Sequence, residues 1–312
     1  MLLGGRRGAA GAAGAAGAAG AAGGGGGSRD AGEVEKFGQL GGEWWRPGGG
    51  FAALHALNPL RVGFVRRAVA AAALSSGAGP PSSPAAGAPL AGLRVLDVGC
   101  GGGLLSEPLA RLGGRVLGLD AAPESVAAAR AHLASHSPDL RERLEYRVAT
   151  AEELRREEAA AGAGGGFDLV VCSEVVEHVS SPWAFCRTLG ALLRPGGVLV
   201  VSTMSRTPRA YLEAILGAEH VLGVVPRGTH DWGKFVNPEE LCRMLETAPP
   251  GEDGGDEGGE GGAGGGAGGG GGLEMQLLTG MSYNPISGRW RQVERTDVNY
   301  IASFSHSKVG TA

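Results

Sequence analysis

The residues with the clearest capacity for chemistry form a glycine-rich segment, Asp97-Val98-Gly99-Cys100-Gly101-Gly102-Gly103. It follows a short apolar run that is typical of a strand and precedes a run that is typical of a helix. Glycines at such a junction let the backbone turn sharply and let a ligand approach the main chain closely. Asp120 ends the next predicted strand about twenty residues further on, where a carboxylate can accept hydrogen bonds from both hydroxyls of an adenosine ribose. The pattern predicts a site for an adenosine-containing cofactor.

Two classes of cofactor share this geometry, and the glycine spacing separates them. Dinucleotide-binding enzymes carry G-x-G-x-x-G/A. Counting from Gly99 places Leu104 at the third glycine, and counting from Gly101 places Ser106 there, so neither reading fits. Asp97, two residues before Gly99, instead matches D/E-x-G-x-G-x-G, the pattern of methyltransferases that use S-adenosylmethionine (SAM). We predict a SAM site, and a tight turn without a ligand is the alternative.

A second group of polar side chains follows the fourth predicted strand. Ser173 comes at the end of that strand, and we expect it to contact the cofactor because ligands of open α/β sheets lie outside the carboxyl ends of the strands. Glu174, Glu177 and His178 come next. Carboxylates suit a magnesium ion, although imidazole is a less usual ligand for so hard a cation. In the alternative, Glu177 and His178 orient a substrate, and His178 acts as a general base.

A parallel sheet would bring these groups together, and the order of the predicted elements supplies one. From Leu93 onward strands and helices alternate, which is typical of βαβ units. The predicted fold is α/β: the Rossmann-like class I methyltransferase fold, with a seven-stranded, mostly parallel sheet flanked by helices. Strands are predicted at 94–98, 115–119, 144–148, 167–172, 198–203, near 275–279 and at 298–304, and helices at 104–112, 123–133, 152–160, 183–193 and 238–245.

The composition argues against several other classes of protein. The formal net charge is −4, and no basic stripe indicates nucleic-acid binding. The apolar runs are shorter than the roughly 20 residues of a membrane-spanning helix. The four cysteines contain no C-x-x-C pair, which indicates a reducing compartment and argues against a structural zinc site or a disulfide framework.

Glycine is the most unusual residue of the composition and marks the expected domain boundaries. The 312 residues include 60 glycines, far above the average share of about 7%. We predict a low-complexity leader at 1–31, an N-terminal helical segment and linker at 32–90, and a methyltransferase domain at 91–306 with a Gly- and acid-rich surface insertion at about 249–273. The leader carries arginines but no acid before Asp30, which suits a mitochondrial transit segment and suits plain low complexity equally.

Several longer segments resemble the O-methyltransferases of ubiquinone biosynthesis. The glycine loop is typical of the whole superfamily, whereas Asn58-Pro59-Leu60-Arg61 and Gly228-Thr229-His230-Asp231 are much more specific. The resemblance covers roughly residues 33 to 306 apart from the linkers. The matching segments are Trp44-Trp45, Leu54-His55, 58–61, 96–103, 174–179, 226–232, 283–285 and 297–300.

The resemblance implies an enzyme that moves the methyl group of SAM to ring hydroxyls of polyprenylated phenols, a dihydroxy-polyprenylbenzoate and a demethylated ubiquinol. By position it implies that Arg61, Gly99, Asp120 and Ser173 bind the cofactor, and that Glu174, Glu177 and His178 hold Mg²⁺. Such a cation lowers the pKa of a phenol, which is about 10, and orients the ring. From the residues alone, Arg61 is interpreted as a surface charge. With the resemblance, Arg61 is interpreted as binding the cofactor carboxylate in a bidentate way.

The resemblance also implies a place in the cell and partners. We expect a peripheral enzyme on the matrix side of the mitochondrial inner membrane, within a multi-subunit coenzyme Q biosynthetic complex. The apolar segment 210–222 is our candidate for the membrane contact, and a core helix is the alternative. Trp44 and Trp45 are expected to pack in the core or to cover the cofactor. Two other functions stay open: a catechol-type O-methyltransferase with another substrate, and a non-catalytic methyltransferase-like subunit.

Overall fold

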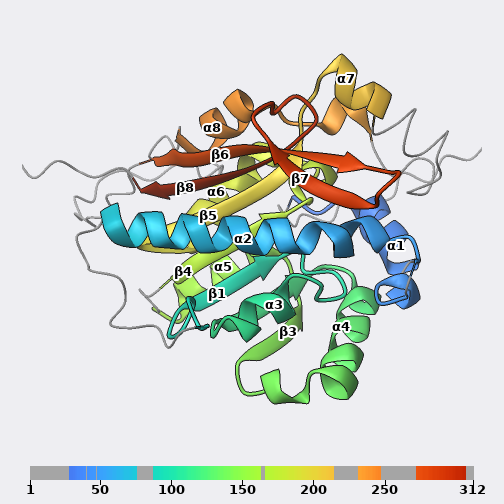
Figure 1. The fold of residues 1–312 in the computed structure, drawn as a ribbon. Helices are drawn as coiled ribbons and strands as arrows, with labels where there is room; N and C mark the ends of the chain where they lie inside the picture. The colour runs from blue at the N-terminus through green and yellow to red at the C-terminus, as the bar shows by residue number, and fades with distance from the viewer. Residues whose placement is uncertain are drawn as a thin grey trace, which may run out of the picture.

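One mixed sheet organises the part of the chain that the computed structural model describes, residues 28–39, 41–46, 48–75, 87–162, 166–213, 231–246 and 272–306. Its eight strands have the order β3-β2-β1-β4-β5-β8-β6-β7 (Figure 1). Strands β1 to β5 pair in parallel, and β8, β6 and β7 extend the sheet in antiparallel pairing. The strands are β1 (Arg94–Val98), β2 (Arg115–Asp120), β3 (Leu144–Val148), β4 (Phe167–Ser173), β5 (Leu193–Met204), β6 (Leu273–Asn284), β7 (Arg289–Val293) and β8 (Asn299–His306).

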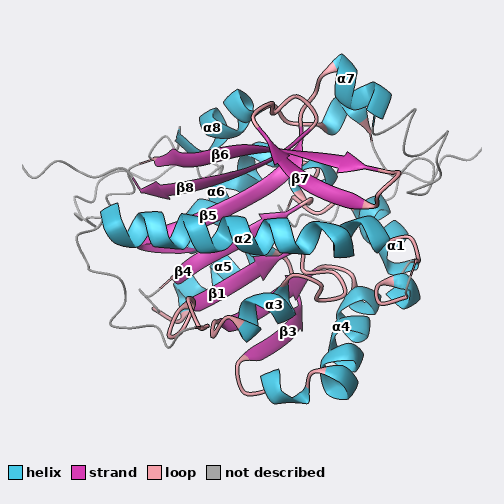
Figure 2. Ribbon diagram, in the orientation of Figure 1, coloured by secondary structure: helices cyan, strands magenta, loops and turns pink. Residues whose placement is uncertain are grey.

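Helices cover both faces of this sheet (Figure 2). One face packs against α2 (Ala52–Ser75), α3 (Ser106–Arg111) and α4 (Pro123–His136). The other packs against α5 (Ala151–Ala160), α6 (Pro182–Leu192) and α8 (Pro238–Glu246). The N-terminal helix α1 (Ala31–Gln39) lies against α4. The remaining short helices are α7 (Pro208–Ala210), η1 (Gly41–Glu43), η2 (Pro138–Leu140), η3 (Val176–His178) and η5 (Trp232–Lys234).

The central strands are apolar on both sides because each face of the sheet has its own core. Successive side chains of a strand point to opposite faces. In β4, Leu169 and Val171 accordingly join the core beneath α2, whereas Val170 and Cys172 join the core beneath α6. All four are almost fully buried. This explains why residues 167–172 are almost all apolar, as is typical of a strand buried on both faces.

The predicted elements of the parallel half are confirmed, and the strand count is corrected. Strands were expected at the positions of β1 to β6 and β8, but β7 was not, so the sheet has eight strands rather than seven. β7 is an edge strand with the sequence RWRQV and no fully buried residue, so it lacks the apolar run by which the other strands were found. Residues 194–197, which lie between the helix predicted at 183–193 and the strand predicted at 198–203, belong to β5.

Several expectations concern residues outside the described part. These are the leader up to residue 27, the linker at 76–86, the Gly- and acid-rich insertion up to residue 271 and most of the apolar segment 210–222. The domain boundaries stay predictions, although α2, which lies in the predicted N-terminal segment, packs directly on the sheet. Among the described helices, none is both long and apolar enough to cross a membrane.

Candidate cofactor and substrate site

The glycine loop turns at the carboxyl end of β1, where the connections that follow β1 and β4 lead to opposite faces of the sheet. The helix after β1 packs on one face of the sheet and the helices after β4 pack on the other, so a crevice opens between these two strands. Gly99, Gly101 and Gly103 have φ of +70°, +53° and +86°. The amides of Gly99 and Cys100 donate to the carbonyl of Leu119, at 2.7 and 3.0 Å. The loop is thereby fixed to the end of β2.

Close packing explains why glycine is needed at two of these positions. A Cβ added at Gly99 would lie 2.4 Å from a methyl carbon of Val175, and one at Gly101 would lie 2.3 Å from the ring of Trp44. Both positions also have a φ that side chains with a Cβ rarely adopt. The loop is therefore confined between the segment after β4 and the N-terminal tryptophan.

Two aspartates hold this loop from different sides. Asp120 accepts from the amides of Gly101 and Ala122, at 2.8 Å each, and its side chain lines the pocket. Asp97 is 2% exposed and accepts from Ser106 Oγ at 2.5 Å. Burial raises the pKa of both carboxyls, that of Asp97 to about 6. Asp120 is thus placed to meet a ligand, whereas Asp97 ties the loop to the start of α3.

Arg61 reaches the same crevice from α2. Its side chain is 4% exposed, so the interpretation as a surface charge is wrong. Nη1 donates to Ser173 Oγ at 3.0 Å, and Nη2 donates to the carbonyl of Leu54 at 3.3 Å and to Asn58 Oδ1. Nε is buried and has no hydrogen-bond partner among the described residues. A buried guanidinium with an unused donor fits an anionic group of a ligand.

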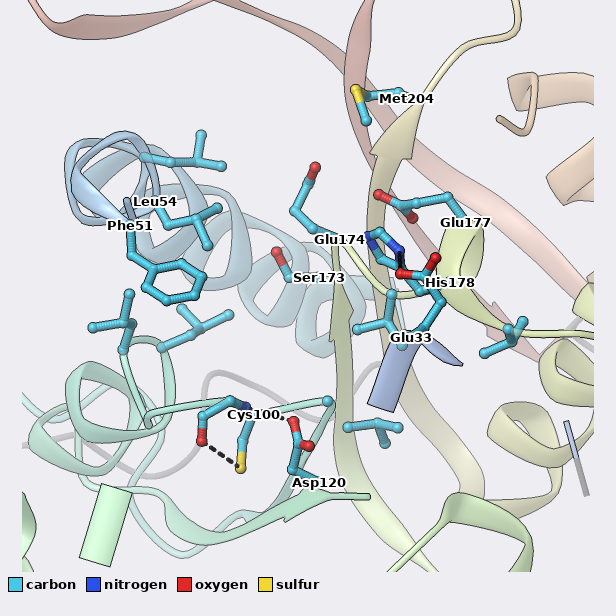
Figure 3. A pocket seen from close by; sticks show the side chains of 18 of the residues that line it. Glu33, Phe51, Leu54, Cys100, Asp120, Ser173, Glu174, Glu177, His178 and Met204 are labelled. Atoms are coloured by element: carbon cyan, nitrogen blue, oxygen red, sulfur yellow. Dashed lines mark hydrogen bonds and ion pairs between the residues drawn. The ribbon is translucent and has the colours of Figure 1, made fainter. Parts of the chain in front are cut away.

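One pocket of about 720 Å³ is lined by Arg61, Asp97, Gly99, Gly101, Asp120 and Ser173. Its volume is within the usual range for a small-molecule site. Figure 3 shows Ser173 and Glu174 between Asp120 on one side and Glu177 and His178 on the other. The pocket therefore has two polar halves, one at the glycine loop and one at the segment after β4. Its apolar walls include Phe51, Leu54, Leu57, Met204, Leu212, Tyr283 and Trp290.

The acidic half contains two carboxylates, half-buried Glu174 and buried Glu177. Glu174 has a positive φ of +58°, and no other non-glycine residue of the described structure has a positive φ. Its Oε1 accepts from Ser202 Oγ at 2.6 Å. Glu177 is 3% exposed; Oε2 accepts from Thr203 Oγ1 at 2.7 Å, whereas Oε1 is buried without a hydrogen-bond partner in the described structure. Strain of about 1–3 kcal/mol at an αL residue is typical of functional sites.

The neighbouring carboxyl groups of Glu174 and Glu177 repel each other when both are ionised, which favours binding of a positive charge between them. Burial, and after it the charge on Glu177, raises the pKa of Glu174 to about 7. Nevertheless, within the described residues no three acidic, histidine or cysteine side chains gather closely enough to hold a metal ion. The predicted ligands Glu174, Glu177 and His178 share the pocket without forming a ready coordination site.

His178 contacts a residue that the sequence did not single out. Its Nδ1 lies 2.9 Å from Glu33 Oε2, on α1. Glu33 also lies 3.8 Å from Lys234 Nζ. Neither Glu33 nor Lys234 lies in a recognisable motif, so no local signal could have pointed to them. Trp44, expected to pack or to cover the cofactor, stacks on Phe51 and lines the pocket beside the glycine loop.

Comparison with known proteins agrees with this geometry. A family model described as a methyltransferase domain matches residues 64–248. A ubiquinone biosynthesis O-methyltransferase from Azorhizobium caulinodans is 42% identical over 271 residues, which cover 87% of this chain and 91% of that protein. One from Methylobacterium sp. is 42% identical over 88% of this chain and 94% of that protein. The chain belongs to the ubiquinone biosynthesis O-methyltransferases.

Membership in this family confirms the predicted class I fold and SAM-dependent O-methyl transfer in ubiquinone biosynthesis. All seven site residues predicted from the sequence line the same pocket. Among solved structures, the N-methyltransferase NodS from Bradyrhizobium japonicum, in complex with S-adenosyl-L-homocysteine, aligns with TM-score 0.48 and 16% identity over 88% of this chain and 99% of that chain. The magnesium ion, the mitochondrial location and the protein partners stay predictions.

Proposed function

We propose that this enzyme transfers the methyl group of SAM to a ring hydroxyl of a polyprenylated dihydroxybenzoate or demethylubiquinol. The observation that carries the proposal is the single pocket in which the glycine loop and the acidic segment after β4 face a common space. A cofactor in one half and a catechol ring in the other would meet at Ser173 and Glu174. The apolar walls suit the ring and the beginning of its prenyl chain.

The residues of the cofactor half match successive parts of SAM. Asp120 would accept hydrogen bonds from the ribose hydroxyls, and the bare backbone at Gly99 and Gly101 would let the ligand approach. Arg61, which already donates to Ser173, would bind the cofactor carboxylate through its remaining donor. Bound in this way, the cofactor would supply its methyl group to the acidic half of the pocket.

The acidic half suits activation of a phenol. A phenol is a weak nucleophile until its proton leaves, and Glu177 and His178 are the groups that would accept or orient that proton. Methyl transfer then requires the attacking oxygen, the methyl carbon and the sulfur to lie in line. The tight walls of the pocket, from α2 to the β6–β7 hairpin, would hold the ring for that alignment; Trp290 Nε1 donates to the carbonyl of Ala53 at 2.9 Å and ties the two walls together.

Magnesium belongs to this proposal because carboxylates are the ligand type that the ion prefers, although these side chains form no ready coordination site in the described structure. Glu174 is half-buried and Glu177 is buried, their charges repel each other, and Glu177 Oε1 lacks a hydrogen-bond partner among the described residues. Together with His178 they would hold the ion, which when bound lowers the pKa of a catechol hydroxyl. EDTA should abolish turnover and added Mg²⁺ should restore it. Full activity in chelator would rule out the metal.

The decisive assay of the function uses SAM labelled in its methyl group and a short-chain prenylated dihydroxybenzoate, with the product identified by mass spectrometry. We expect the label on a ring oxygen. Methylation of simple catechols but not of the prenylated acid would favour another catechol-type O-methyltransferase. Binding of SAM without any methylated product would favour a non-catalytic subunit.

The location and the partners are proposed on the same basis. A prenylated substrate dissolves in membranes, so we propose peripheral contact with the matrix side of the mitochondrial inner membrane, within a coenzyme Q biosynthetic complex. Tyr211, Leu212 and Trp232 are 42%, 57% and 38% exposed, and Leu212 also lines the pocket. Leu212→Glu should reduce flotation with phosphatidylcholine–cardiolipin vesicles, whereas Leu74→Glu, at a more exposed leucine of α2, should not. Equal flotation would exclude this contact.

A further inference from the structure

A short N-terminal strap, defined here as residues 28–39, brings a carboxylate into the acidic half of the pocket. Glu33 Oε2 lies 2.9 Å from His178 Nδ1, although the two residues are 145 positions apart in the chain. Their side chains are only 20% and 14% exposed. Both line the pocket, and Figure 3 shows the carboxylate of Glu33 directed at the imidazole ring.

The strap is anchored at two residues shortly before Glu33, so the carboxylate is held in place rather than merely near. The carbonyl of Ser28 accepts from the amide of Ser180 at 2.8 Å, and Ser28 N and Oγ donate to Glu152. Asp30 Oδ1 caps α1 by accepting from the amide of Glu33 at 3.3 Å, while its Oδ2 accepts from Lys234 Nζ at 3.1 Å. The backbone of Glu33 is thus fixed relative to the sheet.

Positive side chains surround the carboxylate of Glu33: Lys36 Nζ and Lys234 Nζ lie 3.7 and 3.8 Å from its oxygens. An ordinary glutamate has a pKa of about 4.3 and is ionised at neutral pH. An ionised carboxylate accepts hydrogen bonds only. The nitrogen of His178 that faces Glu33 must therefore carry the proton.

We propose that Glu33 is a positioning residue for the methyl-transfer site: it holds the imidazole of His178 in one orientation and as the Nδ1–H tautomer, which assigns the role proposed above for His178 to Nε2. The arrangement follows the general rule that the partner of one imidazole nitrogen decides the role of the other. The inference rests on the function proposed above for His178. It adds a residue from outside the methyltransferase domain predicted from the sequence.

The competing explanation is that Glu33 only ties the strap to the rest of the protein and has no role in catalysis. Matched variants separate these two explanations. Glu33→Ala removes the carboxylate from His178. Glu35→Ala removes an exposed carboxylate from the same helix and is the control. Asp30→Asn weakens the other anchor of the strap, its ion pair with Lys234, and leaves Glu33 in place.

The test combines kinetics with the full-length enzyme and a spectroscopic readout. Glu33→Ala should lower kcat by about 10- to 100-fold, the usual effect of losing such a supporting partner, with the KM of the prenylated substrate and the Kd of S-adenosylhomocysteine changed by less than about threefold. Glu35→Ala should keep kcat within about twofold of wild type. Asp30→Asn should lower kcat by less than Glu33→Ala does, because the carboxylate of Glu33 is still present beside His178. In the background of His178→Asn, adding Glu33→Ala should lower kcat no further, because the two residues act as one unit.

Nitrogen-15 NMR of labelled histidines reads the tautomer directly, with the His178 signal assigned by its loss in His178→Asn. Wild type should show the Nδ1–H tautomer at a pH where the ring is neutral, and Glu33→Ala should show a mixture. The Nε2–H tautomer in wild type overturns the inference even if Glu33→Ala does not fold. So does a Glu33→Ala kcat equal to that of Glu35→Ala. An unchanged kcat in His178→Asn would instead refute the function proposed for His178.

Discussion

The buried guanidinium of Arg61 gives the sharpest test of the cofactor site. Arg61→Met keeps an unbranched side chain of similar reach but removes every donor. It deletes the bonds to Ser173 Oγ and to the carbonyl of Leu54, and it deletes the buried Nε that has no partner in the described structure. If the guanidinium binds the cofactor carboxylate, the variant must lose affinity for that group alone.

The expected loss follows from the kind of bond removed. A hydrogen bond between charged groups contributes about 1.5–3 kcal/mol, so the Kd of S-adenosylhomocysteine should rise by roughly 10- to 150-fold. Folding should suffer as well: burial lowers the pKa of Arg61, and the charges of the neighbouring acids Glu174 and Asp97 oppose that effect. Breaking a buried ionic contact costs about 3–5 kcal/mol of unfolding free energy.

Isothermal titration calorimetry with two ligands separates affinity from stability. Methylthioadenosine lacks the amino-acid part of the cofactor, so wild type and Arg61→Met should bind it with equal affinity. S-adenosylhomocysteine carries the carboxylate, and only wild type should bind it more tightly because of that group. Arg66→Met, at an exposed arginine of the same helix, is the control and should behave as wild type. If Arg61→Met binds S-adenosylhomocysteine as tightly as Arg66→Met does, the assignment of Arg61 to the carboxylate is wrong.

Two further predictions test the loop itself. The folded-state pKa of Asp97, about 6 against an ordinary 3.8, means that its stabilising contribution is present below about pH 4 and is lost as the pH rises through 6. Relative to Asp97→Asn, wild type should therefore lose about 3 kcal/mol of unfolding free energy between pH 4 and 7, measured by urea titration; parallel pH profiles would contradict this. Gly101→Ala should weaken cofactor binding at least tenfold because its Cβ meets Trp44, whereas Gly162→Ala, with φ +61° and open space around it, should leave binding unchanged; equal affinities would show that the loop tolerates the Cβ.

The sequence by itself determined the parallel half of the sheet and the cofactor loop. Apolar runs such as 167–172 encode strands through burial alone, and a glycine with a positive φ is a local requirement of the backbone. Because parallel strands must align their carboxyl ends, the loop, Asp120 and Ser173 could be placed at one edge before any coordinates were known. The polar edge strand β7 lacked such an apolar run, and so the strand count was one short.

Only the tertiary structure decided what surrounds that edge. Arg61 bonds to Ser173 across 112 residues of chain, and Glu33 bonds to His178 across 145. A single charged residue in a helix looks the same in sequence whether it faces solvent or a pocket, because its fate depends on how the helix is rotated and docked. Helix packing buried Arg61, and the anchored strap brought Glu33 to the imidazole; both contacts arise from distances between elements, which no local pattern of residues contains.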